Sequence, residues 1–127
     1  MNKTDASYVI GTFTAKGTGI VSLTGRMKTN SGSSSGGSVN SYIFVSKTQD
    51  AVAFSTFSGG GYTGSVATST DTNFITGFGC NMTASSYRDY SVNFSVEKGV
   101  SYYIHAVGLS TYANNIQYNY IRIKGTF

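Results

Sequence analysis

Cysteine is almost missing from this sequence, and proline and tryptophan are missing altogether: 127 residues contain one cysteine, Cys80. One thiol cannot form an intramolecular disulfide and cannot build a zinc site by itself. Charged residues make up only 11% of the chain, but aromatic residues make up 14%, which is not the composition of a disordered segment. We therefore expect a folded domain with a hydrophobic core and without a disulfide framework, metal or cofactor.

Two kinds of hydrophobic segment are also missing. The N-terminal residues, MNKTDASYVIGTF, contain no apolar stretch like that of a signal peptide. No apolar run reaches the roughly 18 residues that a membrane-spanning helix needs. We therefore expect no export signal and no membrane insertion. Two interpretations remain: an extracellular domain excised with an added Met1, or a virion protein of the tail or surface, released by lysis.

Alternation of apolar and polar residues is the pattern that dominates. In YSVNFSV, Tyr90, Val92, Phe94 and Val96 alternate with serine and asparagine, as in a strand with one buried face. No helical period persists for three turns. We predict an all-β fold, an antiparallel β-sandwich that is jelly-roll-like and has about eight or nine strands. The predicted strands are residues 8–14, 19–29, 39–47, 51–57, 62–68, 74–83, 90–96, 100–109 and 116–127.

The length suits one domain, which we place at residues 8–127, after a linker or cloning remnant at residues 1–7. The serine- and glycine-rich stretch NSGSSSGGS covers residues 30–38 and separates two predicted strands. The 29 residues before it are too few to bury a core of their own. We therefore interpret this stretch as a loop between strands of one domain.

Catalytic motifs are weak. The run GSSSG at residues 32–36 matches the G-x-S-x-G pattern, but a nucleophile elbow needs a helix directly after the serine, and a strand follows here. His105 lies in the middle of a predicted strand, where a structural or solvent-facing role is expected. The carboxylates fall in different predicted loops. We therefore expect no catalytic residues and no enzymatic activity.

Tyrosine-containing loops are the candidate binding sites. A sugar needs a flat apolar face for its C–H groups and planar polar side chains for its hydroxyl groups, and tyrosines in loops also make protein contacts. The segment SSYRDYS, with Tyr90 pointing inward, and the loops GGGYTG and STYANN offer such residues. The candidate ligand-binding residues are Tyr87, Arg88, Asp89, Tyr62, Tyr112, Asn114 and Asn115.

The net charge is +4, without a run of like charge. Arg26 and Lys28 have the spacing of one strand face, and so do Arg122 and Lys124. Each pair is interpreted as a solvated strand end or as a patch for an anionic polymer. Nucleic acid is not an expected partner, because the tyrosines neighbour serine, asparagine and glycine rather than basic residues.

The C-terminal part of the chain, YSVNFSVEKGVSYYIHAVG and then IQYNYIRIKGTF, resembles the closing strands of β-sandwich domains that end bacteriophage tail fibres and receptor-binding proteins. The shared pattern is a strand, a V-x-K-G turn, a Y-x-I strand and a final I-x-I-x-G strand. It is also similar to tumour-necrosis-factor-like and complement-head jelly rolls, which are trimers. The resemblance implies a homotrimer that recognises a glycan or protein on a host surface, and it transfers no individual binding residue.

These observations together predict a non-enzymatic binding module of a phage tail fibre or receptor-binding protein, with a host-cell-surface glycan as its expected ligand. Two alternatives remain open. One is a structural virion protein, such as a capsid decoration or fibre piece, without a ligand. The other is an adhesin or lectin domain from a bacterial surface.

Overall fold

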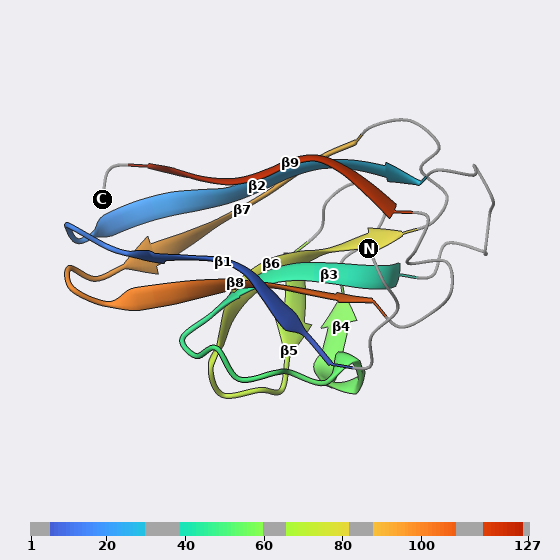
Figure 1. Ribbon diagram of the computed structural model, residues 1–127, viewed down its shortest axis with the longest axis horizontal. Coiled ribbons are helices and arrows are strands. Elements are labelled where there is room, and N and C mark those ends of the chain that lie inside the picture. Colours follow the sequence, from blue (N-terminus) through green and yellow to red (C-terminus); the bar gives the residue numbers. More distant parts are fainter. Residues whose placement is uncertain (1–5, 30–38, 60–65, 82–87, 109–115, 126–127) are drawn as a thin grey trace.

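Two antiparallel sheets pack face to face (Figure 1). The computed structural model describes residues 6–29, 39–59, 66–81, 88–108 and 116–125. The strands in these ranges are β1 (Tyr8–Thr14), β2 (Gly19–Thr29), β3 (Val39–Ser46), β4 (Phe57–Gly59), β5 (Val66–Ser69), β6 (Phe74–Asn81), β7 (Arg88–Val96), β8 (Ser101–Gly108) and β9 (Ile116–Gly125). The six-stranded sheet has the order β1-β8-β3-β6-β5-β4, and the three-stranded sheet has the order β7-β2-β9. The predicted all-β sandwich is confirmed.

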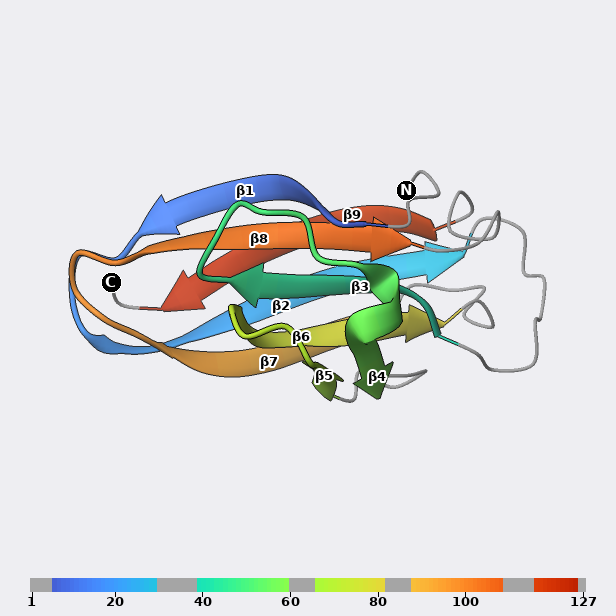
Figure 2. The ribbon, with the colours of Figure 1, turned by 90° about the horizontal axis from the view of Figure 1, so that it is seen from below.

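The strands pair in the nested order of a jelly roll. β1 pairs with β8, β2 with β7, β3 with β6, and β4 with β5, all antiparallel. Two features extend this plan: β4 and β5 lie at the edge of the larger sheet, and β9 lies beside β2 in the smaller one. Figure 2 views the larger sheet from its outer side. The expected jelly-roll-like fold is therefore present.

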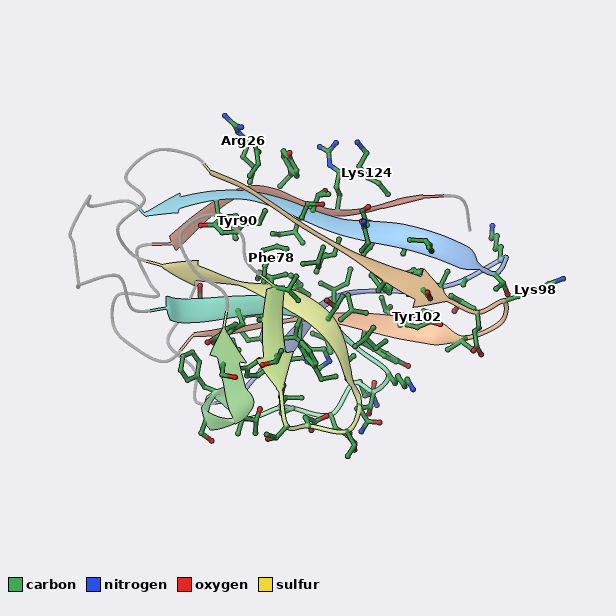
Figure 3. All side chains as sticks on the ribbon, turned by 180° about the vertical axis from the view of Figure 1, so that it is seen from behind. Arg26, Phe78, Tyr90, Lys98, Tyr102 and Lys124 are labelled. Carbon is green, nitrogen blue, oxygen red and sulfur yellow. The ribbon has the colours of Figure 1, made fainter. Side chains whose placement is uncertain are left out.

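The main core lies between the two sheets. The ring of Phe78 in β6 stacks on Tyr90 in β7, with ring centroids 5.3 Å apart, and so connects the larger sheet to the smaller one (Figure 3). Gly25 of β2 lies against the same ring and leaves room for it. The buried residues of this core are Ala15, Val21, Leu23, Met27, Ile43, Val45, Phe78, Tyr90, Val92, Phe94, Val96, Tyr102, Ile104 and Ala106.

A second core covers the outer face of the larger sheet. Phe44 of β3 is fully buried and contacts Phe57 and Phe74, with ring centroids 4.8 Å and 5.8 Å from its own. The segment between β3 and β4 lies over this face and contains a 3-10 turn, η1 (Phe54–Thr56). The centre of the larger sheet is therefore buried on both faces, and all residues from Ser41 to Ser46 of β3 are buried.

Several expected boundaries are corrected by the structure. Residues 51–57 do not form a strand; η1 occupies residues 54–56 and β4 begins at Phe57. Arg88 and Asp89, which we expected in a loop, begin β7. Ser7 is buried, and its backbone N–H donates to the Val52 carbonyl oxygen at 2.9 Å, so the folded part includes residues that the sequence assigned to a linker.

The serine- and glycine-rich stretch at residues 30–38 lies outside the described residues. The strands that it joins, β2 and β3, belong to different sheets. It is therefore the connection from the smaller sheet to the larger one. The predicted strand at residues 62–68 also lies partly outside the described ranges, and its described part belongs to β5, which begins at Val66.

The packing at Gly25 predicts that one added methyl group destabilises the fold. An alanine Cβ there would lie 2.8 Å from Ile121 Cδ1 and 3.0 Å from Phe78 Cζ. We expect Gly25→Ala to lower the free energy of unfolding by about 1–3 kcal/mol, as overpacking does in other cores. Gly17→Ala is the matched control, because a Cβ at Gly17 meets nothing within 4 Å. Urea denaturation of both variants tests this, and equal midpoints would contradict it.

Candidate functional site

Most of the predicted binding residues lie outside the described part of the chain. Those residues are Tyr62, Tyr87, Tyr112, Asn114 and Asn115. Of the remaining two, Arg88 is placed by its backbone at the start of β7, opposite Met27 of β2. The structure therefore leaves the predicted cluster untested and brings Asp89 to the outer face of the three-stranded sheet. Tyr90 points inward and is buried, as predicted.

The outer face of the small sheet is formed by the polar residues of its strands. Val21, Leu23, Gly25 and Met27 of β2 are buried, so the residues that alternate with them face outward. The same alternation holds in β7. Cross-strand pairing then places outward residues in three rows: Asp89–Arg26–Tyr120, Ser91–Thr24–Arg122 and Asn93–Ser22–Lys124. We call the side chains of these three rows the outer face.

Direct contacts orient several side chains of the outer face. Arg26 Nη1 donates to the two carboxylate oxygens of Asp89, at 3.1 Å and 3.3 Å. Arg122 lies over the ring of Tyr120, with its guanidinium carbon 4.0 Å from the ring centroid. Such contacts hold long side chains along the sheet surface. An exposed pair like Arg26–Asp89 adds little to stability, so its main effect is on side-chain position.

The third row adds an ordered amide. Ser22 Oγ donates to Asn93 Oδ1 at 2.6 Å, which leaves the amide N–H groups of Asn93 for other acceptors. Lys124, at the other end of this row, is exposed and points away from the sheet (Figure 3). Neither Lys124 nor Arg122 forms an ion pair with another described residue. The outer face thus combines hydroxyl, amide and carboxylate groups with an excess of positive charge.

The two pairs of basic residues, Arg26 with Lys28 and Arg122 with Lys124, lie on neighbouring strands. β9 pairs with β2 along its length, so Arg122 and Lys124 lie beside the strand that carries Arg26. Lys28 is placed by its backbone opposite Gln117 of β9. The sequence shows only that each pair shares a face of its own strand. Which strands become neighbours is decided by the sheet order.

His105 lies in a separate, buried network. Its Nε2 is 2.9 Å from the carbonyl oxygen of Thr48, which can only accept, so Nε2 carries the proton. Its Nδ1 then accepts from Ser7 Oγ, at 2.8 Å. Ser7 Oγ in turn accepts from the backbone N–H of Val52 at 2.8 Å, and the imidazole stacks on Phe44. The ring therefore fixes the beginning of the domain to the segment that follows β3.

This network has the form of a nucleophile and base but lacks what catalysis needs. Ser7 and His105 are both buried, at 7% and 0% exposure, so a substrate has no access to the hydroxyl group. The third partner is a carbonyl rather than a carboxylate. The histidine is therefore structural. Among the described residues, no three histidine, cysteine or acidic side chains lie close enough to hold a metal ion.

The burial of His105 predicts a pH-dependent stability. Burial lowers the pKa of His105 below its ordinary value of 6.5, against smaller opposing effects of the Thr48 hydrogen bond and the Asp71 charge. The unfolded chain therefore takes up a proton first as the pH falls. We expect the free energy of unfolding to be largest above pH 6.5 and to decrease below it.

Urea denaturation between pH 7.5 and pH 5 measures this effect, since His105 is the one histidine of the chain. His105→Gln is the control: it should be less stable at neutral pH and should lose the decrease on acidification. A decrease of the same size in His105→Gln would assign the effect to other groups.

Comparison with known proteins gives no match: no family model, curated protein or solved structure matches the chain. The resemblance to tail-fibre domains therefore stays a prediction. In the described ranges no helix is long and apolar enough to cross a membrane. Function must be inferred from the geometry and charge of the described surfaces.

Proposed function

We propose that this domain is a non-enzymatic binding module that recognises an acidic glycan on a cell surface. The observation that carries the proposal is the excess of basic side chains on the outer face, next to hydroxyl and amide groups. Arg122 and Lys124 are exposed, two residues apart on one strand, and lack ion-pair partners among the described residues. A linear polyanion that follows the strand would meet both charges in succession.

Uncharged groups on the outer face supply the contacts that a sugar needs. The oxygen of Asn93 accepts from Ser22, and no described residue accepts from its amide N–H groups. Asp89 and Arg26 hold each other in place and offer further acceptors and donors. Planar amide, carboxylate and guanidinium groups suit the paired hydroxyl groups of a sugar. The positive charge adds a preference for acidic over neutral sugars.

We further propose that the module belongs to a virion, at the tip of a tail fibre or in a receptor-binding protein. The resemblance of the last strands to such domains supports this context, as do the low charge content and the jelly-roll pairing. A structural virion protein without a ligand and a bacterial adhesin or lectin domain remain the alternatives. A domain that bound no polysaccharide would favour the structural alternative.

Binding to a polyanion tests the outer face directly. We expect the domain to bind dextran sulfate and not dextran, with an affinity that decreases as salt is added. The double variant Arg122→Gln/Lys124→Gln should bind more weakly. Its slope of log affinity against log salt concentration should be shallower by about one to two, by analogy with other polyanions. Biolayer interferometry over a salt series provides the measurement.

The control for this test removes the same charge elsewhere. Lys16 and Lys98 are exposed and lie in turns outside the outer face. Lys16→Gln/Lys98→Gln should therefore retain most of the binding. An equal loss in both double variants would show that net charge alone attracts the polymer, and equal binding of dextran would remove the electrostatic basis of the proposal.

Trimer formation is the corresponding prediction for assembly. β1 is the edge strand of the larger sheet, and three of its apolar side chains, Tyr8, Val9 and Ile10, are about two-fifths exposed. Apolar groups on a strand edge are suited to burial against another subunit. We expect light scattering to give three times the chain mass of 13.4 kDa. A mass of one chain at micromolar concentration would contradict this.

A further inference from the structure

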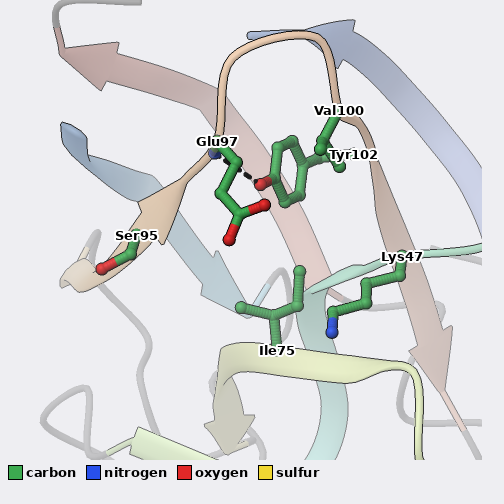
Figure 4. Close-up of a pocket in the computed structure, with 6 residues that line it drawn as sticks. All are labelled: Lys47, Ile75, Ser95, Glu97, Val100 and Tyr102. Carbon is green, nitrogen blue, oxygen red and sulfur yellow. Dashed lines mark hydrogen bonds between the residues drawn. The ribbon is translucent and has the colours of Figure 1, made fainter. Parts of the chain in front are cut away.

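A hollow beside the turn between β7 and β8 lies apart from the rows of the outer face. Its volume is about 380 Å³, within the range of small-ligand pockets (Figure 4). Both sheets contribute to its walls, together with the turn. The residues that line it are Lys47, Ile75, Ser95, Glu97, Val100 and Tyr102.

Backbone hydrogen bonds fix the wall that carries Glu97. Its N–H donates to the hydroxyl oxygen of Tyr102 at 2.8 Å. The turn is closed by the N–H of Val100, which donates to the Glu97 carbonyl at 3.1 Å, and by Gly99, whose φ of 84° favours glycine. The position of Glu97 therefore does not depend on its carboxylate, which is left to face the hollow.

The opposite wall carries a positive charge that is placed in a similar way. The backbone N–H of Lys47 donates to the Asn73 carbonyl at 2.9 Å, so the start of this side chain is fixed. In Figure 4 the ammonium group of Lys47 and the carboxylate of Glu97 both point into the space beside Ile75. Neither forms an ion pair with the other or with any other described residue.

Apolar groups separate the two charges. Ile75 lies between them, and Val100 and the ring of Tyr102 complete the apolar lining. The Tyr102 hydroxyl accepts from Glu97, so its own proton remains for a further acceptor. The hollow thus presents an anion, an apolar surface and a cation in succession. A ligand complementary to it has a cation, a short apolar chain and an anion in the same succession.

We propose that this hollow binds a zwitterionic small molecule of the ω-amino carboxylate class. The ligand's ammonium group lies against Glu97, its carboxylate lies against Lys47, and its methylene groups cover Ile75 and Val100. A ligand with one charge leaves one wall without a partner. Lys47 and Glu97 do not pair with each other, so a ligand whose two charges are separated by methylene groups can contact both.

Titration of the isotope-labelled domain with 6-aminohexanoate tests this proposal, followed by amide chemical shifts. We expect shifts at residues 47, 75 and 95–102, because these residues line the hollow or belong to its turn. Hexanoate and hexylamine keep the chain and one charge each, and each should bind about two- to fivefold more weakly, as expected for the loss of one exposed ion pair. Shifts of equal size with either analogue, or none at the hollow, would overturn the proposal.

Charge reversal gives a second, independent test. Lys47→Glu or Glu97→Lys alone should weaken binding of 6-aminohexanoate, because one end of the ligand then meets a like charge. The double variant Lys47→Glu/Glu97→Lys should regain binding, because the ligand can enter in the reverse orientation. Lys98→Glu is the matched control; this residue points away from the sandwich at the same turn and should have no effect (Figure 3).

The tests of the hollow do not depend on whether the outer face binds a glycan. Neither Lys47 nor Glu97 belongs to its rows, so these variants should bind dextran sulfate with little change beyond that of the control. The comparison of 6-aminohexanoate with its analogues uses the unmodified domain and does not depend on how a variant folds. A folded double variant that fails to regain binding would show that the two walls do not act together.

Discussion

The contact of Phe78 with Tyr90 and Gly25 is the constraint on which the sandwich depends. Phe78 belongs to the larger sheet, and the other two residues belong to neighbouring strands of the smaller one. The ring fits because Gly25 lacks a side chain and because Tyr90 lies parallel to it, with 18° between the ring planes. This contact sets how the small sheet lies on the large one.

The two sheets differ in how much of their surface remains available to bind a ligand. The larger sheet is covered on its inner face by the smaller sheet and on its outer face by the aromatic cluster around Phe44. Its His105 is also occupied, by two hydrogen bonds and a stacked ring. The smaller sheet is buried on one face only. Its other face carries ordered polar side chains, among them Arg26 with Asp89 and Ser22 with Asn93.

Strand β7 contributes to both proposed sites through different parts of its length. Asp89, Ser91 and Asn93 join the rows of the outer face, while Ser95 and the following Glu97 line the hollow. The outer face is open and carries several positive charges, which suits an extended polyanion. The hollow is smaller and has one charge of each sign, which suits a compact zwitterion. The two surfaces thus differ in charge pattern as well as in shape, although one strand supplies residues to each.

Local alternation explains why much of the fold was predictable. The strand at residues 90–96 has one apolar face, and the structure buries Tyr90, Val92, Phe94 and Val96. The burial of one face depends on residues two apart in one strand, so the sequence alone determined it, together with the all-β class. The sequence predicts a linker at Ser7, because nothing in its neighbours indicates that it contacts His105, which lies 98 residues away. Tertiary structure alone decided that contact. It also decided that Arg26 meets Asp89 and lies beside the strand of Arg122, and that Lys47 and Glu97 face one hollow. Each of these depends on which distant strands become neighbours.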